Sequence, residues 1–268
     1  MNRQDKIVEN LGDATWKAFL DAVDLFSFIG ELTVTMVKTL RQPHKIRWRE
    51  TFYYMDQCGC KALPITIIIC LLMGLILGFQ GAVQLRKVGT DIFLADFVGL
   101  SILKELGPLM VAMIATGRAG SAFAAEIGTM KVSEEVDALE TMGFSPQRFL
   151  VIPKLLAMLV MMPLLTVFGN IAGIIGGFIV GISMLQLPPI AYYNRTIAAI
   201  SPTIFSLGLI KSAVFAIIIT VVGCMRGFQA ENDAQSVGRS TTSAVVTAIF
   251  WIVIADWVLT MIFTMMGY

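Results

Sequence analysis

Two long stretches of this 268-residue chain, residues 62–85 and 155–194, carry no charged side chain at all. A helix that crosses the hydrocarbon core of a bilayer needs about 20 consecutive apolar residues, so each stretch is long enough to span it. Hydrophobic residues make up 56% of the chain and charged residues only 15%, whereas about a quarter of a typical soluble domain is charged. The sequence therefore predicts an integral membrane protein of the all-α class.

The apolar stretches predict five transmembrane helices, at about residues 63–84, 92–116, 155–181, 203–224 and 242–265. Orientation follows from the distribution of Lys and Arg, which are enriched in cytoplasmic loops. With the N-terminus inside, the cytoplasmic segments 1–61, 117–154 and 225–240 hold nine, four and two such residues, fifteen in all, and the outer segments hold three. The count predicts a cytoplasmic N-terminus and a C-terminus on the outer side.

The region before the first span has a different pattern. Residues 14–41 look helical. Opposite their charged residues, apolar residues recur at helical spacing: Trp16, Phe19, Leu20, Val23 and Phe26. This pattern is typical of an amphipathic helix in the membrane interface. A sixth span is the competing interpretation, but it would bury Asp24 and Glu31 at considerable cost. We therefore predict two regions, an N-terminal cytoplasmic and interfacial region at 1–61 and a five-span domain at 62–268.

A short polar helix is expected between the second and third spans, at residues 134–142. Ser133 is a suitable N-cap, Glu134 and Glu135 occupy the positive first turn, and Gly143 can end the helix before Pro146. A helix of about ten residues is too short to be stable alone in water, so something must hold it. It is either a coupling helix that docks into a groove of a nucleotide-hydrolysing subunit or a helix that rests on the membrane surface.

Four charged residues fall deep inside the predicted spans, where such residues are rare and usually functional, whereas Asp96 is expected near the outer interface. Lys104 and Glu105 are adjacent, so they point about 100° apart and each needs its own partner or a wet cavity. Pro108 leaves a carbonyl unpaired and predicts a kink there. Either the pair lines a cavity or it belongs to a buried ion network that holds helices together. Lys211 and Asp256 lie at similar depths, about 12–14 Å from the outer ends of their helices, and are expected to form a structural ion pair.

The central sequence resembles the MlaE (YrbE) family of permeases, the membrane subunits of ABC transporters that work with MCE-domain lipid carriers. The resemblance is carried by "LKELGPLMVAMIATGRAGSAFAAEIGTMKVSEEVDALETMGFSPQRFLVIPKLLA" at residues 103–157. It is also carried by "LIKSAVFAI" at 209–217 and by "GRSTTSAVV" at 238–246. It covers roughly residue 63 to the C-terminus. Within the first sixty residues only the general character is similar, and no fused STAS domain is visible.

The resemblance implies a homodimeric permease in a bacterial inner membrane, with an ABC ATPase below it and an MCE-domain lipid-binding protein outside. A small STAS-type accessory subunit is a further partner it allows. Phospholipid would move between the membrane and the MCE carrier and so contribute to outer-membrane lipid asymmetry. By the same resemblance Lys104 would meet a lipid phosphate and Glu105 would shape the polar end of the pocket. Three residues would form the acyl-chain wall, although they could also be ordinary packing: Phe79, Gln80 and Leu85.

The predicted coupling helix would present two stripes to the ATPase, and Gly143 would turn the chain back toward the membrane. One stripe has Glu134, Asp137, Ala138 and Thr141, and the other has Glu135, Leu139 and Met142. The chain has no G-x-x-x-x-G-K-[ST] phosphate loop, so we expect no enzymatic activity and no cofactor of its own, with ATP bound by the partner subunit. The net charge of +1 gives no sign of nucleic-acid binding.

Other functional classes fit less well. No metal site is expected, because the single histidine and the four cysteines do not converge on a ligand set. The alternative function is an ion-gradient-driven secondary transporter of a hydrophobic substrate, with Glu105 or Asp256 as the proton carrier. Such a transporter would be expected to have inverted repeats, which the sequence does not display. A ladder of glycines in the third span allows another helix to approach closely, either within one subunit or across a dimer: Gly169, Gly173, Gly177 and Gly181.

Overall fold

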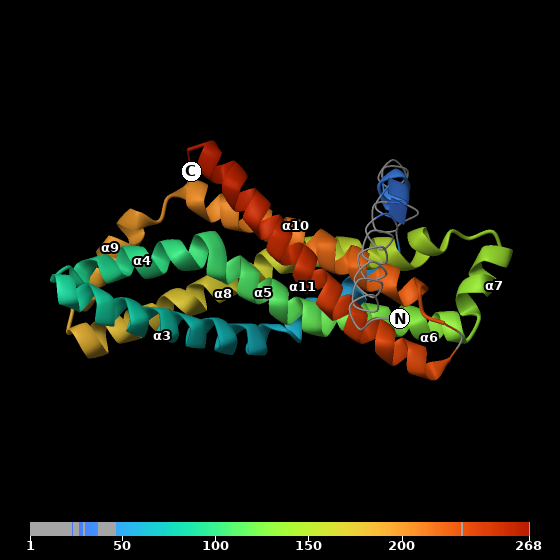
Figure 1. Ribbon diagram of the computed structural model, residues 1–268, viewed down its shortest axis with the longest axis horizontal. Helices are drawn as coiled ribbons and strands as arrows, with labels where there is room; N and C mark the ends of the chain where they lie inside the picture. Colours follow the sequence, from blue (N-terminus) through green and yellow to red (C-terminus); the bar gives the residue numbers. More distant parts are fainter. Residues whose placement is uncertain (1–22, 24–26, 29, 37–46, 232, 268) are drawn as a thin grey trace, which may run out of the picture.

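The computed structural model describes residues 23, 27–28, 30–36, 47–231 and 233–267, and they contain helices and turns but no β-strand. Five segments are long and apolar enough to cross a membrane: Trp48–Val88, Asp91–Val132, Gln147–Leu185, Pro202–Phe228 and Ala234–Met265. They run along the long axis of an elongated bundle (Figure 1). The prediction of an all-α membrane protein with five spans is confirmed.

The first two spanning segments are not uniform α-helices. The first contains α2 (Trp48–Met55), a π-helical turn (Asp56–Cys60) and α3 (Leu63–Val88). The second contains a 3₁₀ turn (Asp91–Phe93), α4 (Leu94–Ser101), a π turn (Ile102–Leu106), α5 (Gly107–Ala115), a second π turn (Thr116–Gly120) and α6 (Ser121–Val132). The first begins earlier and the second ends later than the predicted spans, because hydropathy detects the apolar middle of a helix and not the polar turns that continue it.

The third spanning segment lies at the centre of the bundle. It consists of a π turn (Gln147–Val151) and α8 (Ile152–Leu185), and α3 and α10 (Pro202–Phe228) pack against it. A Cβ atom on Gly173 would lie 2.5 Å from Ile102 Cδ1, and one on Gly177 would lie 2.4 Å from Val98 Cγ1. The chain's own helices therefore cover the glycine ladder, and its close packing is within the subunit.

A short helix that the sequence analysis did not predict, α9 (Pro189–Ala199), follows α8 and packs on α4. Tyr192 attaches α9 to α8, because its buried ring lies edge-on to Phe178 of α8, with 5.4 Å between ring centroids. Burial raises the pKa of Tyr192 to about 12. Arg195 Nε donates to both carboxylate oxygens of Asp96 at 2.9 Å, and this hydrogen bonding raises the pKa of Arg195. These contacts hold α9 across the end of the bundle.

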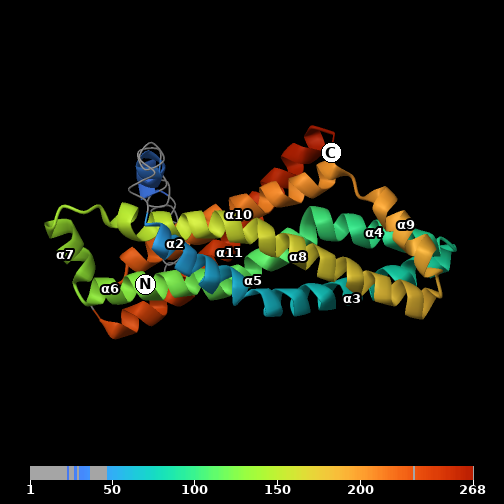
Figure 2. The ribbon, with the colours of Figure 1, turned by 180° about the vertical axis from the view of Figure 1, so that it is seen from behind.

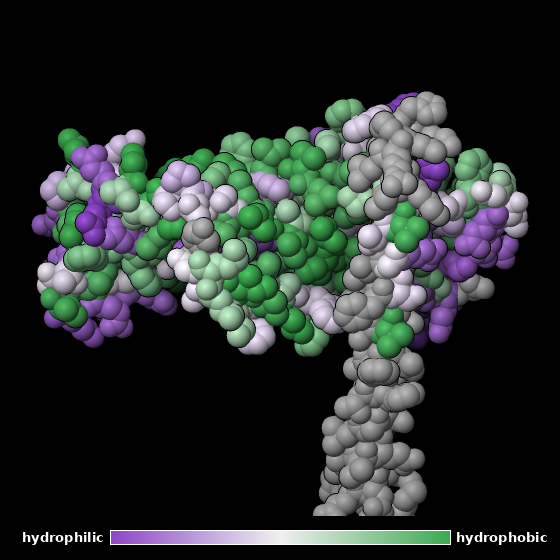
Figure 3. Space-filling view, turned by 90° about the horizontal axis from the view of Figure 1, so that it is seen from above, coloured by the Kyte–Doolittle hydropathy of each residue, from purple (hydrophilic) through white to green (hydrophobic). Residues whose placement is uncertain are grey.

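The surface has the polarity expected of a membrane protein. Hydrophobic residues fill the central part of the face in Figure 3, and hydrophilic residues gather toward the two ends. The predicted interfacial helix at 14–41 lies mostly outside the described residues. Of that stretch, residues 30–36 are helical, and Leu32 is buried in the core cluster of the bundle. The described part therefore packs on the spanning helices.

Candidate functional sites

The polar helix between the second and third spans is α7 (Glu135–Thr141), at the extreme end of the molecule beyond α6 (Figure 1). It is shorter than predicted, and the prediction that Ser133 caps it is wrong. Ser133 Oγ donates to the carbonyl of Thr129 at 2.9 Å and so belongs to the last turn of α6. Glu134 instead stands at the N-cap with a φ of 59°. The chain reverses direction between the two helices there, and a left-handed residue makes this tight reversal possible.

The end of α7 is as predicted. Gly143 has a φ of 79°, in the left-handed region that glycine adopts without strain. Its N–H donates to the carbonyl of Glu140 at 2.9 Å, and the N–H of Phe144 donates to the carbonyl of Leu139 at 3.0 Å. These two bonds form a Schellman motif, which ends the helix and satisfies two of its last carbonyl groups.

One side of α7 is fixed to the bundle and the remainder is open. Val136 is buried at 3% exposure, and Asp137 Oδ1 lies 2.6 Å from Lys131 Nζ on α6. Met142 is 62% exposed and Phe144 is 53% exposed, although both are apolar and lie at a polar end of the molecule. The other predicted coupling residues are exposed, except for the half-buried Leu139: Glu134, Glu135, Ala138 and Gly143. The exposed side thus combines carboxylates with apolar side chains.

A buried lysine in the middle of the bundle contacts two carboxyl groups. Lys211 is 1% exposed, and its Nζ lies 2.8 Å from Asp256 Oδ1 and 2.8 Å from Thr260 Oγ1. Its third partner is the Glu105 carboxylate, which also accepts from Thr260 Oγ1 at 3.2 Å. The structure therefore brings together the two residues expected to pair and adds Glu105. In this cluster, which joins the second, fourth and fifth spans, one lysine therefore contacts two carboxyl groups.

Lys104, the neighbour of Glu105, is half-buried, and no ion pair is found for it within the described part of the chain. It lies in the π turn Ile102–Leu106, immediately before the α5 turn that contains Pro108. The chain changes direction here, since α4 and α5 do not share one axis in Figures 1 and 2. A proline and a π turn together account for the predicted kink.

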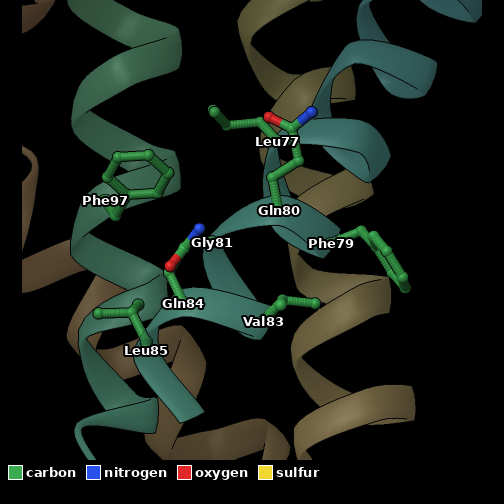
Figure 4. A pocket seen from close by; sticks show the side chains of 8 residues that line it. All are labelled: Leu77, Phe79, Gln80, Gly81, Val83, Gln84, Leu85 and Phe97. Carbon is green, nitrogen blue, oxygen red and sulfur yellow. The ribbon is translucent and has the colours of Figure 1, made fainter. Parts of the chain in front are cut away.

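A hollow of about 610 Å³ lies where α3 approaches α4. It is lined by eight residues: Leu77, Phe79, Gln80, Gly81, Val83, Gln84, Leu85 and Phe97. All three residues predicted as an acyl-chain wall, Phe79, Gln80 and Leu85, are among them. In Figure 4, Phe97 faces α3 from α4, whereas Phe79 points to the other side of α3. Lys104 and Glu105 do not line this hollow. Lys104 is seven residues beyond Phe97, which is about 10 Å further along the helix.

A second buried lysine was not anticipated. Lys154 is fully buried, and its Nζ lies 3.0 Å from Glu126 Oε1 and 2.9 Å from the hydroxyl of Tyr54. Tyr54 also donates to Glu126 Oε1 at 2.5 Å, and the lysine ammonium lies 4.4 Å from the centre of the tyrosine ring. The cluster joins α2, α6 and α8, and α2 lies along α8 in Figure 2. The available signal was a lysine with apolar residues on both sides, "FLVIPKLLAML".

Comparisons with known proteins agree on one family. Residues 51–262 match the family model described as Permease MlaE. The chain is 33% identical over 258 residues to a probable ABC transporter permease protein of Rickettsia prowazekii, which covers 96% of this chain and 98% of the relative. It is 33% identical over 209 residues to the intermembrane phospholipid transport system permease protein MlaE of Haemophilus influenzae, with coverages of 78% and 80%. It is 32% identical over 219 residues to the chloroplastic protein TRIGALACTOSYLDIACYLGLYCEROL 1 of Arabidopsis thaliana, with coverages of 82% and 63%. The matched range includes all the sites described above.

Proposed function

The chain belongs to the MlaE permease family of ABC transporter subunits, and from this we propose that it moves phospholipid between the bacterial inner membrane and a periplasmic MCE-domain carrier. A separate ATPase subunit binds ATP and supplies the energy. The N-terminus is cytoplasmic and the C-terminus periplasmic, in accordance with the distribution of Lys and Arg. Two copies of the chain form the transport unit, and transport contributes to outer-membrane lipid asymmetry.

The observation that carries the lipid assignment is Lys104. A half-buried ammonium within a span, with no carboxylate on it among the described residues, is unfavourable unless a ligand or water satisfies it. A phospholipid phosphate is an anion that can reach this depth, because its acyl chains keep the rest of the molecule in an apolar environment. The hollow with Phe79, Gln80 and Leu85 is a candidate for the acyl-chain contact. The phospholipid named in the Haemophilus relative supports the same class of substrate.

The test of this site is Lys104→Glu. Reversing the charge should reduce lipid transfer to the MCE carrier about tenfold or more, because a charge-assisted contact is replaced by repulsion. Lys87→Glu, at the exposed end of α3, is the matched control and should transfer lipid normally. Transfer would be measured with fluorescent phospholipid in proteoliposomes that contain the ATPase. Wild-type transfer by a Lys104→Glu, Glu105→Ala double variant would refute the role of this pair, and transfer that needs an ion gradient but no ATP would favour the secondary transporter.

The coupling role rests on α7. Leu139→Asp with Met142→Asp would place two charges on α7, one at the half-buried Leu139 and one at the exposed Met142, and would leave Val136, which anchors the helix, unchanged. ATPase copurification should fall, or hydrolysis should continue without lipid transfer, while the bundle stays folded. Ile190→Asp is the control, since Ile190 is an exposed apolar residue of α9, at the opposite end of the molecule from α7 (Figure 1). Normal ATPase stoichiometry and normal stimulation by lipid in the α7 variant would instead identify α7 as a helix that rests on the membrane surface.

A further inference from the structure

A smaller hollow lies at the cytoplasmic end of the proposed orientation, between the first and second spanning segments. Its volume is about 250 Å³, and its lining mixes aromatic, polar and charged side chains: Tyr53, Tyr54, Gln57, Cys58, Arg118, Ala119, Ala122, Phe123 and Glu126. Two π turns flank it, Asp56–Cys60 on one segment and Thr116–Gly120 on the other. π turns in helices occur frequently at functional sites, because they shift the side chains around them out of ordinary helical positions.

Arg118 supplies a positive charge that the protein does not neutralise. Its side chain is exposed, and Nη1 donates to the carbonyl of Lys61, which fixes one edge of the guanidinium. No carboxylate of the described residues forms an ion pair with it, and Glu126, on the same hollow, contacts Lys154 through Oε1. Arg118 is one of the residues that line the hollow. An arginine held in this way presents its remaining N–H groups to a phosphate.

The opposite end of the hollow suits a cation. Glu126 lines the hollow, and its side chain is 40% exposed although Oε1 accepts from Tyr54 and Lys154. Tyr53, which is 56% exposed, supplies an aromatic ring to the hollow, and such a ring attracts an ammonium group. Arg118 and Glu126 are eight residues apart, about 12 Å along the helix, so their side chains can hold the two ends of one extended head group.

The order of these groups matches a lipid of the cytoplasmic leaflet. From Lys61 toward the membrane centre, α3 exposes Ile65, Ile68 and Leu72, which provide an apolar surface for acyl chains. Arg118 lies beside Lys61 and Glu126 lies beside Tyr54, nearer the cytoplasm. We propose that this hollow binds the head group of an amine-bearing phospholipid, with the phosphate on Arg118 and the ammonium on Glu126. The assignment rests on the orientation in the proposed function, and not on transport itself.

The experiment measures phospholipid binding to the purified, delipidated permease with its copurifying subunits, by native mass spectrometry and by the lipid-induced shift in Tm. Dioleoylphosphatidylethanolamine should bind, and Arg118→Ala should weaken that binding about tenfold. Arg239→Ala is the matched control, since Arg239 is an exposed arginine on the same side of the membrane, and it should bind as wild type does. Wild-type binding by Arg118→Ala would overturn the proposal.

The ammonium contact is tested with lipids, so that no variant has to fold without Glu126. Dioleoylphosphatidylglycerol and N-acetylated phosphatidylethanolamine keep the phosphate but lack the amine, and each should bind about tenfold more weakly than phosphatidylethanolamine. Equal binding of the three lipids would refute the Glu126 contact. Displacement of the lipid by millimolar inorganic phosphate would identify a soluble phosphate site and overturn the lipid assignment.

Measuring lipid binding to a Lys104→Ala variant separates this inference from the proposed function. The lipid bound in an Arg118-dependent manner should remain on Lys104→Ala, even where transfer is lost. If Lys104 variants transfer lipid normally while Arg118-dependent binding persists, the proposed transport site is wrong and the head-group site stands. If the Arg118-dependent lipid disappears with Lys104→Ala, the two residues hold one lipid and the separate site is refuted.

Discussion

Lys154 and Lys211 are both buried to 1% exposure or less, and each ties together three segments of the bundle, but their surroundings differ. Lys154 faces one carboxylate, a tyrosine hydroxyl and two aromatic rings. Lys211 faces two carboxylates and a threonine hydroxyl. The first cluster has one carboxyl group for its lysine and the second has two. The second also adjoins Lys104, for which no ion pair is found among the described residues.

This difference predicts that the Lys154 cluster is rigid and that the Lys211 cluster can rearrange. In the Lys154 cluster a single acid compensates the ammonium, so losing that acid leaves a buried charge with only neutral partners. In the Lys211 cluster either carboxylate can compensate the lysine, so the other is free to respond to Lys104 or to a ligand. We infer that Lys154 holds α2, α6 and α8 in fixed positions, whereas the Lys211 cluster can tolerate rearrangement of the second span relative to the fourth and fifth.

Glu126→Ala should cause the largest loss of stability. It leaves Lys154 fully buried without a carboxylate, and breaking a buried pair in this way costs about 3–5 kcal/mol. The expected observation is a much lower midpoint in SDS-induced unfolding, measured by far-UV circular dichroism in detergent. Glu126→Ala, Lys154→Met should recover most of the loss, because no charge is then left uncompensated. A single variant as stable as wild type would show that the cluster does not pin the helices.

The Lys154 cluster also shows where sequence analysis stops. The partners of Lys154 are 28 and 100 residues away along the chain, and hydropathy gives depth in the membrane but not which helices are neighbours. The Lys211–Asp256 contact was predictable because the two depths match. Glu105 was not assigned to it, since the π turn Ile102–Leu106 changes the direction in which its side chain points. A sequence pattern based on regular helical spacing does not include such a turn.

Helix boundaries illustrate the same limit on a smaller scale. Gly143 ends α7 as predicted, because only the local backbone decides whether a left-handed residue is needed. Ser133 has the chemistry of an N-cap, but its hydroxyl bonds to α6 instead, since the reversal at Glu134 places it at the end of that helix. The intrinsic preference of one residue was overridden by the path of the chain.

Asp256→Ala should have a clearly smaller effect than Glu126→Ala, about 1–2 kcal/mol, because Glu105 remains to compensate Lys211. Lys211→Ala should be more damaging than Asp256→Ala, since it leaves two carboxylates close together. The Lys211→Ala, Asp256→Ala double variant should recover part of that loss, which a double-mutant cycle on the same unfolding midpoints would measure. Additive losses would mean that the two side chains do not interact in the folded protein, and an Asp256→Ala loss equal to that of Glu126→Ala would remove the contrast between the clusters.

The two hydroxyl groups provide the finest test of the comparison, with the smallest expected effects. Tyr54→Phe keeps the aromatic ring beside Lys154 but removes the hydroxyl that contacts both Lys154 and Glu126. Thr260→Val removes the hydroxyl that contacts Lys211 and Glu105. Each change removes hydrogen bonds to charged groups, which are worth about 1.5–3 kcal/mol in an enclosed site and less where water can replace them. The two lysines are equally buried, and Glu126 and Glu105 are similarly exposed, at 40% and 36%. After Thr260→Val, however, Lys211 keeps two carboxylate partners, whereas after Tyr54→Phe Lys154 keeps only one. Tyr54→Phe should therefore lower the unfolding midpoint more than Thr260→Val, and the reverse order would contradict the assignment of the Lys154 cluster as the more rigid of the two.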